Sequence, residues 1–383
     1  MAATYLMRRI IYHPKYQSYN LGSEHPFTPM RAAMVLDLLK ELGVQVQPLA
    51  PQPVEAQALY AVHDPDYVAT IEAVSKGEEV AGAESYGLGT ADNPIVAGMA
   101  EGARYMAGGT LLGARLLLEG QADRVLQLGG GFHHAHPKLA AGFCLYNDLA
   151  LAIRAMTEAG WHVAYLDVDV HHGDGVQEIF YDDDKVMTIS LHESGEYIFP
   201  GSGWLHELGR GMGRSLKLNL PLEPFTQGES YLEVMEKVVG EALYWFKPDA
   251  LVLQAGADAH FSDPLADLML TTQDFERLYD KVFQMADTLC KGRLLITLGG
   301  GYSLTATSRI WTMLYLKFFA QELPDVLPEA WRARWEKRLG KNMPRFLHDP
   351  NPAYPPIPRK QEIIRHNRDL IQRLLDAVAP DWL

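Results

Sequence analysis

The sequence predicts an α/β protein with a central, mostly parallel β-sheet flanked by helices, and three observations lead to this fold class. Patterns typical of helices and of strands alternate along most of the 383 residues. The strand-like runs are short and almost wholly apolar, as expected for strands that are covered on both faces. Each run ends in glycine-rich or polar sequence. Because ligands bind beyond the carboxyl ends of strands in open α/β sheets, we expect the functional site there.

The first helix is expected over residues 28–43, where Thr28 can cap it, Pro29 suits its first position and Gly43 suits its end. Apolar and charged residues at helical spacing predict further helices over residues 97–120, 146–159, 228–246 and 273–290. Short apolar runs between the helices predict strands that begin at Arg124, His162, Lys185, Ala250 and Arg293.

The sequence changes character after residue 322. Residues 1–322 are predicted to form the main domain, and residues 323–383 to form a C-terminal extension packed on it. The extension contains the stretch "DPNPAYPPIPRK", whose prolines exclude regular structure, and then a predicted helix from Gln361 to Ala377. We therefore expect one large domain with a wrapped tail.

Composition and charge narrow the classes of function. The chain is 48% hydrophobic and carries a net charge of -14 at pH 7. An acidic chain without a basic patch repels phosphate backbones, so we expect no nucleic-acid partner. The two cysteines, Cys144 and Cys290, and the absence of a signal-peptide pattern predict a reduced, cytoplasmic protein. No apolar stretch is long enough to cross a bilayer, and no membrane association is expected.

The stretch "LDVDVHHGDG", residues 166–175, concentrates acids and histidines behind an apolar run. In a strand, Asp167, Asp169 and His171 would point to one face. Buried carboxylates need compensation, and carboxylates with an imidazole suit zinc or a similar first-row ion. The alternative is that the acids cap the next helix or form ion pairs, but the density of ligand types favours a metal. The glycines around Asp174 predict a tight turn that returns this third carboxylate to the site.

Adjacent histidines in "LGGGFHHAHP", His133 and His134, are candidate ligands, general bases or ordinary loop residues. A buried neutral histidine needs a partner for its other ring nitrogen. Asp167 and Asp174 are two acids available for two histidines, which favours two carboxylate–histidine pairs.

Asp258 and Tyr302 complete the candidate site. Asp258, at the end of "LVLQAGAD", can join Asp169 and His171 in a set of one histidine and two carboxylates. Such a set leaves a position open, which is typical of catalytic rather than structural metal sites. Tyr302 in "LGGGYS" places a phenol at the end of the last predicted strand; the alternative is a packed surface tyrosine.

Several of these stretches, in the same order, resemble the histone deacetylase superfamily, in particular its bacterial, class I-like, acetoin-utilisation type. The resemblance extends roughly from Tyr12 to Phe319 and rests on "GGGFHHAHP", "GFCLYND", "LDVDVHHGDGVQEIF", "KVMTISLH", "FPGSG", "AGAD" and "LGGGYS". It implies a single arginase/deacetylase-like catalytic domain with about eight parallel strands and the active site at their carboxyl ends.

The resemblance also separates roles that strand periodicity leaves open, because alternation alone makes Asp167 as good a ligand as Asp169. It implies a zinc ion, with Fe2+ as the alternative, held by Asp169, His171 and Asp258. It implies catalytic roles for two histidines, the acids that orient them, and one phenol: His134 with Asp174, His133 with Asp167, and Tyr302.

The same resemblance implies a narrow channel for an acyl-lysine side chain. Phe143 and Phe199 would form its walls, the Gly142 carbonyl its base and Asp92 its rim, and Arg31 would line an inner cavity through which acetate leaves.

Monovalent ions are implied as well. A structural K+ or Na+ site matches Asp167, Asp169, His171, Ser190 and Leu191, and a weaker match places a second monovalent ion near Phe180, Asp183 and Val186. The chain departs from the class I-like pattern at Leu298, which replaces the usual first glycine of the run before Tyr302.

These observations predict a zinc-dependent amidohydrolase that removes an acetyl or another acyl group from a lysine side chain of a protein, such as a metabolic enzyme. The alternative within this chemistry is an acetylpolyamine or other small acylated amine. Two rivals are less favoured: a two-manganese ureohydrolase, which needs more carboxylates near residues 171–175, and a non-catalytic binder of acyl-lysine. The oligomeric state stays open.

Overall fold

One parallel sheet of seven strands runs through the centre of the molecule, in the order β1-β2-β7-β6-β3-β4-β5. The computed structural model describes residues 6–382. The α/β prediction is confirmed, and within the described residues the sheet has seven strands in place of about eight. The strands are β1 (Arg8–Ile11), β2 (Arg124–Gln127), β3 (Val163–Asp167), β4 (Val186–Glu193), β5 (Lys217–Leu222), β6 (Ala250–Gln254) and β7 (Leu294–Thr297).

The strands β1 and β5 were not expected from the sequence, and they are the two edge strands. β1 has only four residues, and its first half is charged. β5 contains Lys217, Asn219 and Pro221, which together obscure a strand pattern. Pro221 is tolerated because an edge strand pairs on one side only.

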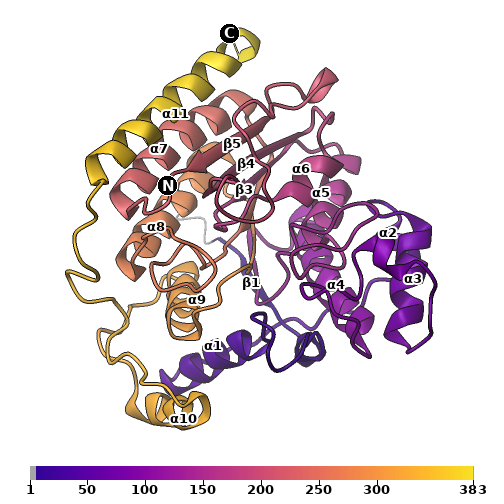
Figure 1. Ribbon diagram of the computed structural model, residues 1–383, viewed down its shortest axis with the longest axis horizontal. Coiled ribbons are helices and arrows are strands. Elements are labelled where there is room, and N and C mark those ends of the chain that lie inside the picture. Colours follow the sequence, from indigo (N-terminus) through magenta and orange to yellow (C-terminus); the bar gives the residue numbers. More distant parts are fainter. Residues whose placement is uncertain (1–5, 383) are drawn as a thin grey trace.

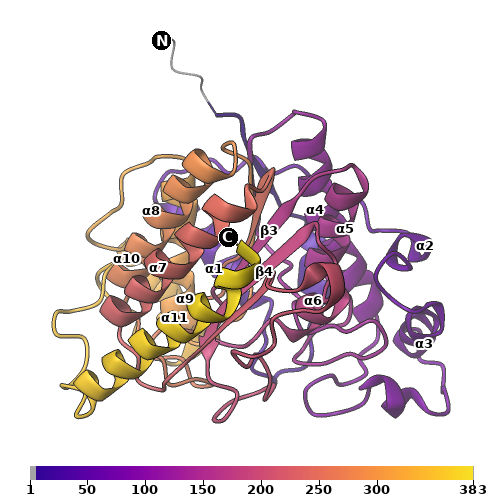
Figure 2. The same ribbon diagram turned by 90° about the horizontal axis from the view of Figure 1, so that it is seen from above.

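Helices cover both faces of the sheet. In Figures 1 and 2, α4, α5 and α6 lie on one side, and α7, α8 and α9 lie on the other. None of the helices in residues 6–382 is long and apolar enough to cross a membrane. The helices are α1 (Met30–Glu41), α2 (Ala56–Leu59), α3 (Pro65–Ser75), α4 (Met99–Leu118), α5 (Asp148–Glu158), α6 (Asp174–Ile179), α7 (Gly228–Phe246), α8 (Thr272–Leu289), α9 (Leu304–Phe318), α10 (Glu329–Leu339) and α11 (Lys360–Trp382).

Local sequence signals explain several helix ends. Helix α1 begins just after Pro29 rather than at it, and the Thr28 hydroxyl accepts a hydrogen bond from the Met30 amide at 3.3 Å. Helix α11 extends beyond Ala377 and includes Pro380. The indole of Trp382 donates to the Ser215 carbonyl at 3.1 Å, so tertiary contact holds a last turn that the sequence pattern did not predict.

The chain beyond residue 322 packs on the main body through buried side chains. Helix α10 lies against α1, where the Trp331 indole donates to the Met34 carbonyl at 3.1 Å. Helix α11 lies along α7, and the Asn367 amide donates to the Thr226 and Ser230 hydroxyls at 2.9 and 3.0 Å. These contacts join the two segments, and the domain boundary at residue 322 stays a prediction.

Asp349, in the segment between α10 and α11, enters the main body as a buried charge. One carboxylate oxygen accepts from the Arg309 guanidinium at 2.9 Å, and the other accepts from His260 Nε2 at 2.9 Å and from the Thr272 amide at 2.8 Å. These charged and polar partners hold the pKa of Asp349 well below its usual value, although burial opposes the shift. Asp349 therefore ties the extension to α8, α9 and the loop after β6.

We expect Asp349→Ala to lower the free energy of unfolding by about 3–5 kcal/mol, because it leaves the Arg309 guanidinium buried without a charged partner. Chemical denaturation of the variant and of the wild type measures this loss. Asp376→Ala, which removes an exposed acid of α11, is the matched control and should be nearly neutral. Equal stability of the two variants would show that the Asp349 network contributes little.

Candidate active site

The candidate site lies where β3, β6 and β7 end side by side near the middle of the sheet. Strand β3 ends at Asp167, so Asp169 and His171 belong to the following loop and not to the strand row that alternation predicted. Main-chain amides of this loop are held by carboxylates: the Asp169 amide donates to Asp167 at 3.1 Å, and the Val170 amide donates to Asp258 at 2.9 Å. The acids themselves therefore shape the loop.

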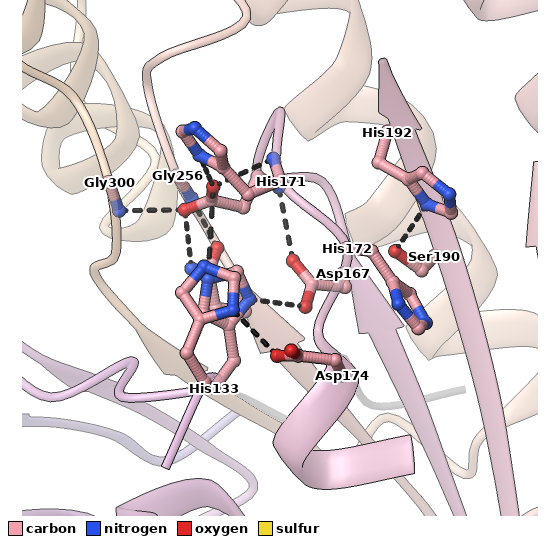
Figure 3. A network of polar contacts seen from close by, with 12 residues as sticks. His133, Asp167, His171, His172, Asp174, Ser190, His192, Gly256 and Gly300 are labelled. Carbon is pink, nitrogen blue, oxygen red and sulfur yellow. Dashed lines mark hydrogen bonds and ion pairs between the residues drawn. The ribbon is translucent and has the colours of Figure 1, made fainter. Parts of the chain in front are cut away.

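Asp169, His171 and Asp258 come together as a candidate metal site. One potential ligand atom from each lies within 4.8 Å of the others, and all three side chains are buried. His171 Nδ1 lies 3.1 Å from Asp169 Oδ1 and 3.3 Å from Asp258 Oδ2. Figure 3 shows His171 on this loop, within a network of polar contacts that also includes Asp167 and His133.

The chemistry of this group fits a divalent cation. Asp258 Oδ2 is buried and accepts no hydrogen bond from the described residues. Burial and the neighbouring Asp169 carboxylate raise the pKa of Asp258 to about 8, as expected for a carboxylate whose charge lacks compensation. At Gly300 a Cβ atom would lie 1.9 Å from Asp258 Oδ2, so this glycine keeps the space around the carboxylate free.

Two histidines beside the metal group are each held by a carboxylate. His133 Nδ1 lies 2.8 Å from Asp167 Oδ2, and His134 Nδ1 lies 2.7 Å from Asp174 Oδ1. Burial and the adjacent His133 lower the pKa of His134 to about 3, so its imidazole is neutral at pH 7. Burial opposes protonation of His133, but the Asp167 and Asp169 carboxylates outweigh it and raise its pKa to about 9. The two rings therefore differ in charge.

Tyr302 lies on the loop after β7, and the Asp263 carboxylate fixes this loop. Asp263 Oδ2 accepts from the Tyr302 and Ser303 amides at 2.7 and 3.2 Å. Burial, together with the Asp258 and Asp169 charges, raises the pKa of Tyr302 well above its usual value. The phenol thus keeps its proton and can donate a hydrogen bond.

An open cavity leads to these groups. Phe143 and Phe199 lie on its wall, Gly142 lies beside His134 and Phe199, and the exposed Asp92 lies at its rim. The cavity is lined by Asp92, His134, Gly142, Phe143, His171, Tyr197, Ile198, Phe199, Leu265 and Tyr302. At Gly142 a Cβ atom would lie 2.3 Å from the His134 ring, so a larger residue there would close the approach.

A second, inner cavity lies behind the first. Arg31 lines it and donates to the Gly299 and Gly301 carbonyls at 2.8 and 3.2 Å. Leu298 lines the same cavity, which locates the one departure from the class I-like glycine run. Phe27 also lines a third cavity, around His133, His134 and Tyr302, which shares His134 and Tyr302 with the open cavity and so lies between the open and the inner one.

The residues predicted for monovalent ions fall into two groups. In the first group, strand pairing places Ser190, within β4, opposite Asp167 at the end of β3. The Ser190 hydroxyl lies 2.8 Å from His192 Nδ1 (Figure 3). In the second group, the carbonyls of Asp183 and Val186 accept hydrogen bonds from a buried lysine, Lys217. Both ion sites stay predictions.

Sequence reasoning missed several residues that hold the site together. Gln254, the last residue of β6, donates to Asp169 Oδ2 at 2.6 Å, and it could have been found as a polar residue that ends a buried strand. His136 lies 3.3 Å from Asp174 Oδ2 and also pairs with Glu178. Asp263 had no spacing that distinguished it from other loop acids.

Two carboxylates and an imidazole that fit a cation, beside two histidines held by carboxylates, define a metal-dependent hydrolase. The chain belongs to the histone deacetylase family, whose domain model matches residues 25–318. This confirms the resemblance seen in the sequence, and hydrolysis of acyl amides is the activity of that family.

The chain is similar to acetoin utilization proteins AcuC over nearly their whole length. It is 38% identical to the protein of Bacillus subtilis over 376 residues, which is 97% of each chain. It is 33% identical to that of Staphylococcus xylosus, covering 95% of this chain and 96% of the relative.

Two solved structures share the fold. A histone deacetylase homologue in complex with SAHA is 27% identical and aligns with a TM-score of 0.86, covering 96% of this chain and 99% of that one. A histone deacetylase homologue from Aquifex aeolicus is also 27% identical and aligns with a TM-score of 0.84, covering 94% of this chain and 100% of that one.

We expect Asp258→Ala to reduce the affinity for a divalent metal by more than about 100-fold, because it removes a metal ligand. Loss of a residue that only hydrogen-bonds to a ligand typically costs about 10- to 100-fold. Metal analysis after dialysis against a weak chelator measures the change. Glu241→Ala, which removes an exposed acid of α7, is the control. Full metal content in Asp258→Ala would contradict the ligand assignment.

We expect His136→Gln to lower stability by about 1.5–3 kcal/mol at neutral pH, since it removes charged hydrogen bonds to Asp174 and Glu178. Burial opposes protonation of His136, but these acids raise its pKa to about 10. A raised folded-state pKa adds stability that is complete below about pH 6.5, the unfolded value, and is lost as the pH rises through the folded one.

The wild type should therefore exceed His136→Gln most below about pH 6.5 and converge with it as the pH approaches 10. Denaturation curves at several pH values measure the difference. His206→Gln, at an exposed histidine, is the control. A difference that does not change with pH would mean that His136 acts through packing and not through charge.

Proposed function

We propose that this protein is a zinc-dependent deacylase that removes an acetyl group, with release of acetate, or another acyl group from the lysine side chain of a protein. One observation carries the proposal: the candidate metal ligand His171, the imidazole of His134 and the phenol of Tyr302 all line one cavity that is open to solvent. Membership of the deacetylase family supports the amide hydrolysis, and the aromatic walls support a linear apolar stem as the part of the substrate that enters.

Asp169, His171 and Asp258 would hold the zinc ion. When bound there, zinc supplies a Lewis acid beside the amide carbonyl. Borderline-soft Zn2+ suits a set of one imidazole and two carboxylates, and Fe2+ is the alternative ion.

His134 acts as the general base in the proposed mechanism. Because Asp174 accepts the hydrogen bond from Nδ1, the lone pair of His134 Nε2 is free to take a proton from the attacking water. The same imidazole then gives this proton to the leaving amine, so that the amide and one water become a free amine and acetate. His133, held by Asp167, lies beside His134 with a distance of 3.9 Å between the ring centroids. At this distance the two imidazoles influence each other's protonation when His134 takes up the proton.

Tyr302 stabilises the negative charge that develops on the carbonyl oxygen. Its phenol keeps its proton because burial and nearby carboxylates disfavour the phenolate. Since the loop amides of Tyr302 and Ser303 are bound to Asp263, the phenol is positioned before the substrate arrives.

The rim and the inner cavity bear on the choice of substrate. Asp92 at the rim can accept hydrogen bonds from backbone amides of a peptide substrate. Arg31 in the inner cavity offers a cation to the acetate product. The net charge of -14 also suits a polycationic acetylpolyamine, which is the second candidate substrate.

A two-manganese ureohydrolase is disfavoured by the ligands present. Within residues 6–382, Asp169, His171 and Asp258 form the single group of at least three convergent metal-ligand side chains. A two-metal site needs further bridging carboxylates between the ions.

We expect the zinc-loaded protein to hydrolyse a fluorogenic acetyl-lysine peptide and to be inhibited by a hydroxamate. The panel also contains longer acyl-lysine peptides and an acetylpolyamine, so the fastest substrate reports the class. Preference for the acetylpolyamine would replace the protein-lysine proposal, and absence of turnover with zinc bound to the protein would overturn the hydrolase.

In the same assay Tyr302→Phe should lower turnover on the order of 100-fold or more, because the oxyanion loses its hydrogen-bond donor, while bound zinc is unchanged. Tyr244→Phe, at an exposed tyrosine of α7, is the matched control. Wild-type turnover in Tyr302→Phe would contradict the proposed role of the phenol.

A further inference from the structure

Lys217, the first residue of β5, is a buried cation that the proposed mechanism does not use. It is the one lysine within residues 6–382 whose side chain is wholly buried. Its Nζ donates to the Val186 carbonyl at 2.6 Å and to the Asp183 carbonyl at 3.2 Å. The Asp183 carboxylate does not pair with this ammonium and binds Arg154 at 3.1 Å instead. The ammonium is thus coordinated by main-chain oxygens.

The carbonyls around Lys217 are those for which the sequence predicted a second monovalent ion. The predicted set was Phe180, Asp183 and Val186. The Phe180 carbonyl accepts from the Asp183 amide at 3.1 Å, and the other two accept from Lys217. Every carbonyl of the set therefore has a hydrogen-bond donor from the chain, and a K+ ion there would compete with the lysine ammonium for the same oxygens.

Burial disfavours a positive charge at this point, whereas the neighbouring oxygens favour it. Burial lowers the pKa of Lys217 to about 7, and the acidic run of Asp182, Asp183 and Asp184 opposes this shift. Hydrogen bonds from an ammonium to carbonyl dipoles also favour the charged form. The carbonyl pair and the acidic run thus stabilise the ammonium in the same way as they would stabilise an alkali cation.

We propose that the Lys217 ammonium is a built-in monovalent cation that replaces a K+ or Na+ ion at the carbonyls of Asp183 and Val186. It holds the loop between α6 and β4 against the start of β5. Because β4 continues from Val186 to Ser190, this loop also fixes the origin of the strand that reaches the candidate active site. The inference concerns ion binding and does not depend on the proposed reaction.

Chemical rescue tests the proposal. Lys217→Ala removes the ammonium and opens space at the carbonyls, while Lys217→Met removes the charge but keeps most of the volume. Unfolding midpoints are measured in KCl, NaCl, NH4Cl and choline chloride at one ionic strength, so that general salt effects cancel. Lys185→Ala, which removes an exposed charge from the same loop, is the matched control.

We expect both Lys217 variants to melt roughly 4 °C or more below the wild type in choline chloride. Potassium or ammonium should raise the midpoint of Lys217→Ala further than that of the wild type, of Lys217→Met and of Lys185→Ala, because only the alanine variant offers a vacant cation site. Equal responses of all four proteins to each cation, or wild-type stability of Lys217→Ala, would overturn the proposal.

If the alanine variant does not fold, a measurement on the wild type can still test the proposal. Crystals of the wild type soaked in Rb+ should show no anomalous peak within coordination distance of the Asp183 and Val186 carbonyls. A Rb+ ion bound to these oxygens beside Lys217 would show that the lysine does not replace the ion.

Discussion

The buried negative charge at the carboxyl end of the sheet is the constraint on which the rest of the structure depends. Asp169 and Asp258 lie in the protein interior on either side of His171, and their charges need a cation or a dense set of donors. Gln254 and the Gly300 amide donate to Asp169, and the Val170 amide donates to Asp258. Strand ends and loops supply these donors, while one Asp258 oxygen accepts no hydrogen bond from residues 6–382.

The loop after β6 shows how distant parts of the chain support this arrangement. It carries Asp258 as a candidate ligand, His260 as the partner of Asp349, and Asp263 as the acceptor for the Tyr302 amide. The extension therefore anchors the same loop that positions both a metal ligand and the phenol. Since a misplacement of about 1 Å can cost a large factor in rate, such an anchor remote from the reacting atoms bears on activity as well as on stability.

Buried cationic side chains complement the buried acids, and they differ in the oxygen atoms that they bind. Arg309 neutralises Asp349 as an ion pair at 2.9 Å. Arg31 binds the carbonyls of the glycine run behind Tyr302 and faces the inner cavity. Lys217 binds main-chain carbonyls with no carboxylate partner. A chain with a strong excess of acids thus places its few interior cations where main-chain or carboxylate oxygens converge.

The sequence by itself determined the α/β class, five of the seven strands and the residues of the candidate site, because apolar runs and closely spaced acids and histidines are local signals. It could not predict the edge strand β5, since Lys217 and Pro221 are acceptable there only through their neighbours. Nor could strand periodicity separate Asp167 from Asp169. The resemblance separated their roles, but only the tertiary structure brings Asp169 together with His171 and the distant Asp258, because β3 ends at Asp167 and Asp169 lies in the loop beyond it.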